Sequence, residues 1–200
     1  MEDKKKQELL ERIISLGKDS SLEIAKSIID HYKVNLKGID YIDEFLEIGM
    51  DYDRFGDFEK ALSMYHKAEK RALAIGDREG LGTIYSNIGV VHNNTKDYDQ
   101  ALEYYQKALE FIEEAKNDQE LGILYNNMGY LYKNILKYRE CVDYYIRSLT
   151  YLDKANDKFS MTASYYNLAE VFAKLFEYET AIKYIDKCIQ IDKELNLVTL

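Results

Sequence analysis

The chain has 200 residues, of which 46% are hydrophobic, a content that supports a buried core and argues against intrinsic disorder. The net charge of −9 disfavours nucleic-acid binding, which requires a clustered basic face. No apolar stretch is long enough to cross a bilayer and no signal-peptide core follows Met1, so we expect a cytoplasmic protein without membrane contacts.

Residues 1–40 are expected to form a helical hairpin. Gly17 and Gly38 stand where its two helices would end, and Ser20 with Glu23 matches a capping box at the start of the second helix. We interpret this hairpin as a terminal cap or a decayed repeat, because a repeat array needs an atypical terminal unit.

From Tyr41 onward the sequence repeats four times with a period of forty residues and without gaps. The predicted units are 41–80, 81–120, 121–160 and 161–200. One column of the alignment holds Gly49, Gly89, Gly129 and Ala169, and another holds Phe58, Tyr98, Tyr138 and Tyr178. A fixed period in this range predicts a stacked array, and such arrays usually present a surface to a partner.

Within each unit the apolar residues recur at the helical spacing of three and four residues, which predicts two helices per unit. In the second unit Asp97 is a candidate N-cap with Gln100 three residues later, and Gly76 suits the left-handed end of the preceding helix. Glycine inside a helix costs about 1 kcal/mol relative to alanine. We therefore expect Gly89 and its equivalents to permit a close helix crossing, with Ala101 and its equivalents on the other side.

The column order resembles the tetratricopeptide repeat. In the second unit it reads Tyr85, Ile88, Gly89, His92, Tyr98, Ala101, Tyr105 and Ala108. The forty-residue period is similar to the long variety found in kinesin light chains, polarity adaptors and Rap- and NprR-type regulators. The resemblance implies an all-α, right-handed superhelix in which the first helix of each unit faces a concave groove.

The sequence contains no recognisable catalytic or metal-binding constellation. His31, His66 and His92 are scattered, and the spacing of Cys141 and Cys188 fits neither a zinc knuckle nor a redox pair. We therefore expect neither an enzyme nor a cofactor. His92 stands in an otherwise aromatic column, which favours a packed imidazole over a ligand.

Asparagine recurs in one column of the predicted first helices, at Asn87, Asn127 and Asn167. Asparagine is a poor helix former, and its amide both donates and accepts hydrogen bonds. One interpretation is that these amides bind the backbone of an extended peptide, as the resemblance implies. The alternatives are that they join neighbouring helices, or that the units inherited them by duplication.

Other polar and aromatic residues are predicted to share this face, and they define the expected peptide-binding site. The candidate residues are Asn87, Asn94, Asn126, Asn127, Tyr130, Lys133, Asn134, Tyr166, Asn167 and Lys174. Lys133 and Lys174 suggest a ligand with some acidic character.

The last predicted helix keeps apolar residues that would normally pack on a following unit. Ile182, Ile189 and Leu195 are therefore candidates for self-association into a homo-oligomer. Three functions remain open from the sequence: an adaptor for a peptide or protein, a self-assembling structural module, and the sensory part of a peptide-responsive regulator.

Overall fold

The apolar columns fold as helices at the predicted spacing, and the all-α prediction is confirmed. The computed structural model describes residues 42–195, so the hairpin predicted for residues 1–40 lies outside the described part. The eight described helices are α3 (Ile42–Arg54), α4 (Phe58–Ile75), α5 (Arg78–Asn94), α6 (Tyr98–Ala115), α7 (Asp118–Asn134), α8 (Tyr138–Lys154), α9 (Lys158–Lys174) and α10 (Tyr178–Glu194).

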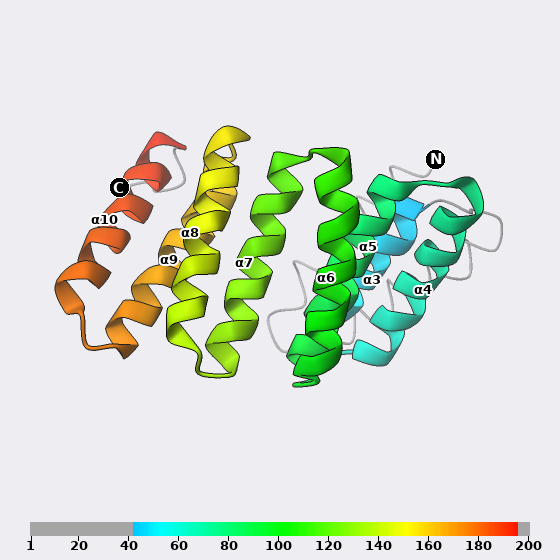
Figure 1. The fold of residues 1–200 in the computed structure, drawn as a ribbon, viewed down its shortest axis with the longest axis horizontal. Coiled ribbons are helices and arrows are strands. Elements are labelled where there is room, and N and C mark those ends of the chain that lie inside the picture. The colour runs from blue at the N-terminus through cyan, green and yellow to red at the C-terminus, as the bar shows by residue number, and fades with distance from the viewer. Residues whose placement is uncertain (1–41, 196–200) are drawn as a thin grey trace, which may run out of the picture.

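Successive helices pack in pairs, and the pairs follow one another along the long axis of the molecule (Figure 1). We call α3, α5, α7 and α9 the first helices, and their partners the second helices. Each first helix also contacts the next first helix, whereas the described second helices do not approach one another as closely. The first helices therefore form the inner layer of a solenoid.

Every corner between described helices uses the left-handed backbone conformation at one residue. These residues follow one another at intervals of twenty: Gly56, Gly76, Lys96, Lys116, Leu136, Asn156 and Phe176. The prediction at Gly76 is confirmed, with φ of 73° and a backbone N–H that donates to the carbonyl of Ala72. The predicted N-cap is also confirmed, because Asp97 Oδ1 accepts from the backbone N–H of Gln100 at 3.4 Å.

The two helices of a pair cross where the mid-helix glycines stand. A Cβ atom at Gly89 would lie 2.5 Å from Cε1 of Tyr105, far inside van der Waals contact. The same clash would occur between Gly129 and the ring of Tyr145. The predicted close approach is confirmed, but the atoms nearest to the missing Cβ belong to a wholly buried tyrosine ring and not to the alanine that we expected.

We predict that Gly89→Ala destabilises the protein, although alanine favours a helix by about 1 kcal/mol. The added methyl group must displace the Tyr105 ring, and overpacking of this kind typically costs about 1–3 kcal/mol. Urea unfolding measures the effect, and a double-mutant cycle with Tyr105→Leu tests its cause. A gain in stability, or an equal loss in the Tyr105→Leu background, would contradict this packing.

Candidate binding surface on the first helices

Asparagine side chains join neighbouring first helices by hydrogen bonds, which we call the carboxamide bridges. The donor Nδ2 atoms and their acceptors are Asn94 with Asp53 Oδ1 at 3.0 Å, Asn127 with Ser86 Oγ at 3.4 Å, Asn134 with Asn93 Oδ1 at 3.0 Å, and Asn167 with Asn126 Oδ1 at 2.9 Å. Each bridge joins residues 41 positions apart, one more than the repeat period. Neighbouring first helices therefore pack with a shift of one residue.

The bridges favour the interpretation that this asparagine column joins helices. Asn127 and Asn167 each use one amide N–H in this way. The Asn87 side chain would need an acceptor at Leu46, which is apolar, and within residues 42–195 this side chain makes no hydrogen bond. No donor in the same range bonds to Oδ1 of Asn127 or Asn167, so these carbonyl oxygens keep their capacity to accept.

Asn126 belongs to a polar network at the interface of α7, α8 and α9. Its Nδ2 donates to Ser164 Oγ at 3.2 Å. Ser164 Oγ lies 2.9 Å from Ser148 Oγ, which donates to the carbonyl oxygen of Gly122 at 2.7 Å. Both serines are wholly buried, and this network satisfies their hydroxyl groups.

Several members of these networks were not predicted from the sequence. They are Asp53, Ser86, Asn93, Ser148 and Ser164. Two of the acceptors, Ser86 and Asn126, could have been found in the sequence. They occupy the same repeat column as Leu46, which is buried. Polar residues in a column that can be apolar indicate an internal hydrogen bond.

Two aromatic side chains of the predicted site are exposed. Tyr130 on α7 is 41% exposed and Tyr166 on α9 is 60% exposed. The Lys133 ammonium lies 4.4 Å from the centre of the Tyr130 ring, in a cation–π contact. Exposed aromatic groups of this kind supply contact area to a partner at a small cost in side-chain entropy.

The positive charge of Lys133 and Lys174, from which a partly acidic ligand was predicted, is partly neutralised by Glu170, which lies between the two lysines. Lys133 Nζ is 2.8 Å from Glu170 Oε2, and Lys174 Nζ is 3.7 Å from Glu170 Oε1. The hydrogen bond from Lys133 holds the pKa of Glu170 below its ordinary value. The Lys133 side chain is only 11% exposed, so its charge acts mainly on Glu170 and on the Tyr130 ring.

His92 is packed in the way that its aromatic column indicates. Its ring stacks on Tyr104, with centroids 5.4 Å apart and an interplanar angle of 7°. In the part of the chain from 42 to 195, no group of histidine, cysteine and carboxylate side chains is arranged to hold a metal ion. Cys141 is wholly buried, and this burial raises the pKa of its thiol to about 12.

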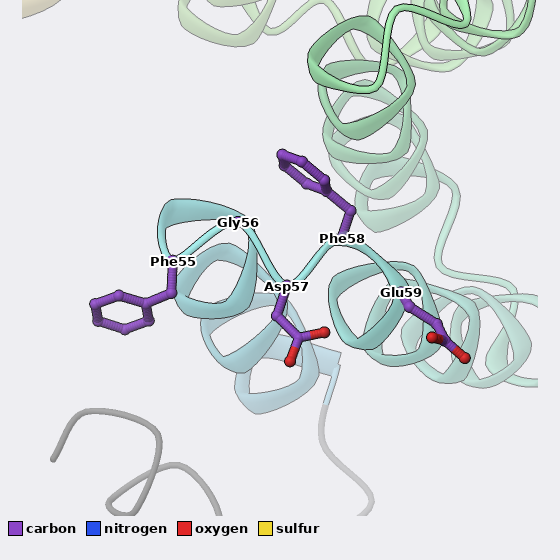
Figure 2. Close-up of a pocket in the computed structure, with 5 residues that line it drawn as sticks. All are labelled: Phe55, Gly56, Asp57, Phe58 and Glu59. Carbon is purple, nitrogen blue, oxygen red and sulfur yellow. The ribbon is translucent and has the colours of Figure 1, made fainter. Parts of the chain in front are cut away.

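A surface pocket of about 380 Å³ lies at the corner between α3 and α4 (Figure 2). Its lining is Phe55, Gly56, Asp57, Phe58 and Glu59, which are consecutive in the chain. The side chains drawn in Figure 2 point in different directions, and they do not converge on a common point. We assign no function to this pocket.

The apolar residues predicted for self-association lie on or next to α10. Ile182 and Ile189 are exposed, while Leu195 is half-buried at the C-cap of the helix. Leu102 and Leu109 occupy the equivalent places on α6, where they pack on the core. No described helix covers the same strip on α10. Among the described helices, none has the length and apolar character required to cross a membrane.

We predict that Glu170→Gln lowers the free energy of unfolding by about 1 kcal/mol at pH 7, the upper end for a partly exposed ion pair, because Lys133 loses its partner. The folded state lowers the pKa of Glu170, so the wild-type advantage is complete above the ordinary value of 4.5 and disappears as the pH falls through the lowered pKa. Urea unfolding of wild type and variant at a series of pH values, from 7 down to below the lowered pKa of Glu170, measures this difference in stability. Glu110→Gln, a change at an exposed glutamate, is the control. A difference between wild type and variant that persists unchanged at low pH would contradict the linkage.

Solved structures with the same fold share little sequence with this chain. BtubC from P. vanneervenii aligns with a TM-score of 0.64 and 20% identity over 90% of this chain and 75% of its own. RapI aligns with a TM-score of 0.70 and 19% identity over 88% of this chain and 65% of its own. Aspartyl phosphate phosphatase F from Bacillus subtilis aligns with a TM-score of 0.76 and 16% identity over 94% of this chain, which spans half of that protein. At these identities the likeness establishes the fold alone.

The sequence itself matches family models in two segments. Both models are described as tetratricopeptide repeat, and they match residues 44–114 and 162–195, together just over half of the chain. No curated protein sequence matches the chain. Repeats of this kind typically bind proteins or peptides, and the matches agree with the paired helices and the glycine crossings described above. The chain therefore belongs to the tetratricopeptide repeat family.

Proposed function

We propose that this protein is a non-enzymatic adaptor that binds an extended peptide, or an extended segment of a protein, along the first helices. The observation that carries the proposal is that the Asn127 and Asn167 amides are each held by one hydrogen bond and can still make others. One N–H of each amide bonds to the preceding first helix, while its carbonyl oxygen has no donor within residues 42–195. The bridge fixes the direction of the amide before a ligand arrives.

A fixed amide is suited to a peptide backbone. Its Oδ1 accepts a backbone N–H, and its second N–H donates to a backbone carbonyl, so the contact does not depend on the ligand's side chains. The bridge also removes part of the entropy cost of ordering the side chain on binding. The bridging interpretation and the peptide-binding interpretation of this column are therefore compatible.

The amides alone do not account for useful affinity. Each amide contact contributes about 0.5–1.5 kcal/mol, whereas micromolar binding requires about 8 kcal/mol. The exposed rings of Tyr130 and Tyr166 supply apolar contact area on the same helices. Because Glu170 neutralises much of the charge of Lys133 and Lys174, we expect only a weak preference for acidic ligands.

The double variant Asn127→Ala, Asn167→Ala tests this site. A displayed library of random linear peptides is selected on the wild-type protein, and the affinities of the selected peptides are measured by calorimetry. Two lost amide contacts predict a weakening of about tenfold or more. Failure of the library to yield any binder, or equal affinities for the variant and the wild type, would refute this binding site.

Ser86→Ala is the matched control, because it removes the acceptor of the Asn127 bridge and leaves the amide in place. If the amides contact the ligand, this variant keeps an affinity within a few-fold of wild type. If Ser86→Ala weakens binding as strongly as the double variant, the bridges act only through the structure of the array.

Self-association through α10 is a second candidate function, supported by the exposed strip of Ile182, Ile185 and Ile189. The equivalent positions on α6 and α8 are covered by the following pair of helices. A second copy of the chain that covers this strip would bury comparable apolar area.

We predict that the average mass in sedimentation rises with protein concentration, and that Ile189→Glu abolishes the rise, because a carboxylate cannot be buried at such an interface without a large cost. Lys183→Glu, an exposed change on the same helix, serves as the charge control. A wild-type protein that stays monomeric at high concentration would exclude this candidate.

A further inference from the structure

Three aromatic rings cluster between the two helices of the second pair, and the third pair repeats the arrangement. In the second pair Tyr85 lies 6.1 Å from Tyr104 and 5.7 Å from Phe111, measured between ring centres. In the third pair the centroid distances from Tyr125 are 6.2 Å to Tyr144 and 5.5 Å to Tyr151. Phe111 and Tyr151 stand forty residues apart, so they fill the same place in successive units.

A cation covers the outer ring of both clusters. The Arg78 guanidinium lies 4.8 Å from the centre of the Phe111 ring, and Lys154 Nζ lies 4.5 Å from the centre of the Tyr151 ring. In the second pair Arg78 is itself held by Glu114, with Nε 3.0 Å from Oε2. The outer ring is therefore enclosed between a tyrosine and a cation.

The fourth pair keeps the two tyrosines of the cluster but lacks the outer ring. Tyr165 lies 6.1 Å from Tyr184, as in the other two clusters. Ile191 stands where the earlier units carry Phe111 and Tyr151.

The cation and its carboxylate partner are retained in the fourth pair. Lys158 and Glu194 lie eighty residues after Arg78 and Glu114, and they form the equivalent ion pair, with 2.6 Å between Nζ and Oε2. The tyrosine and the cation that enclose a ring in the second pair are thus both present, and the ring is absent.

A pocket of about 240 Å³ is lined by residues of α8, α9, α10 and the corner before α9. These three helices lie at one end of the described array (Figure 1). The pocket lining includes Tyr165, Ile191, Lys158, Lys187 and Glu194. Tyr165 is half-buried, whereas the outer ring of each earlier cluster helps to bury the equivalent tyrosine. An apolar cavity of roughly 150 Å³ is sufficient for a benzene ring, so this pocket has room for an aromatic side chain.

We propose that this pocket binds an aromatic side chain, a tyrosine or phenylalanine, from a partner protein. The incoming ring fills the space that Ile191, which is shorter than Phe111 and Tyr151, leaves open, where it packs on Tyr165 and lies under the Lys158 ammonium. Lys187, 5.1 Å from the centre of the Tyr165 ring, strengthens the cationic side of the pocket. Asp153, Asn156 and Gln190, which also line the pocket, provide hydrogen-bond partners for a tyrosine hydroxyl.

This pocket is separate from the peptide-binding site proposed above on the first helices. That site uses Asn127, Asn167, Tyr130 and Tyr166, and none of these residues lines the pocket. Binding at the two sites can therefore be removed independently, and the protein could hold one partner at both.

The test uses N-acetyltyrosinamide as the probe and follows the protein's amide resonances by NMR on the full chain. We expect saturable shifts around Tyr165 and Lys187, with at least tenfold weaker binding of N-acetylleucinamide. Ile191→Tyr restores the ring of the third unit, and we expect it to abolish the probe site. Lys183→Tyr adds the same ring to an exposed position of α10 outside the pocket and keeps the site, which makes it the matched control.

A gain of binding tests the same idea in the opposite direction. Tyr151→Ile gives the third pair the residue of the fourth, and we expect a second probe site with shifts around Tyr125. If either aromatic substitution or Tyr151→Ile prevents folding, as judged by circular dichroism, Lys158→Gln replaces it. We expect that variant to weaken probe binding about threefold or more through loss of the cation over the ring.

Three results with the probes would each overturn the proposal: no saturable shift at Tyr165, equal binding by wild type and Ile191→Tyr, or equal binding of the tyrosine and leucine probes. A variant without residues 196–200 separates a partner from the chain's own tail. Unchanged probe affinity in this variant supports a partner, whereas a clear increase assigns the pocket to the tail and refutes the proposal.

Discussion

The structure depends on the contact between a mid-helix glycine and a buried tyrosine ring in each of the first three pairs. Where Gly89 faces Tyr105, the two helix axes approach more closely than any larger residue would permit. The ring, wholly buried, fills the space beside the crossing. This contact sets the angle and distance within a pair, and through them the position at which the next pair docks. The helical cost of glycine is offset by the packing of the ring.

The docking of successive pairs in turn sets the register of the first helices. Because each first helix is shifted by one residue against the next, a carboxamide reaches the residue 41 positions earlier in the chain. Four such bonds occur in the described array, and they are spread over the three successive interfaces between first helices. Most asparagine side chains of the inner layer are therefore paired, while the rings of Tyr130 and Tyr166 are exposed.

Much of the fold could be predicted from the sequence, because it follows from local rules. The period, the paired helices, the Asp97 cap and the left-handed corner at Gly76 depend on residues close together in the chain. The partners of the asparagines could not be predicted, because they depend on a one-residue shift that arises only when helices pack. The role of Glu170 could not be predicted for the same reason, because its contact with Lys133 joins α9 to α7. The change from Phe111 and Tyr151 to Ile191 is visible in the sequence, but the pocket that it leaves is recognisable only once Lys158 and Glu194 are seen beside it.

The carboxamide bridges have a mechanical consequence. Each bridge joins only two neighbouring first helices. The curvature of the array is therefore set separately at each interface between successive pairs, which we call a joint. At the joint between the first two described pairs only Asn94 has a bridging partner, since Leu46 offers no acceptor to Asn87, whereas the next joint is held by two bridges. Counted in carboxamide bridges, the described interfaces between pairs are therefore held unevenly, with two bonds at the middle interface and one at each of the other two.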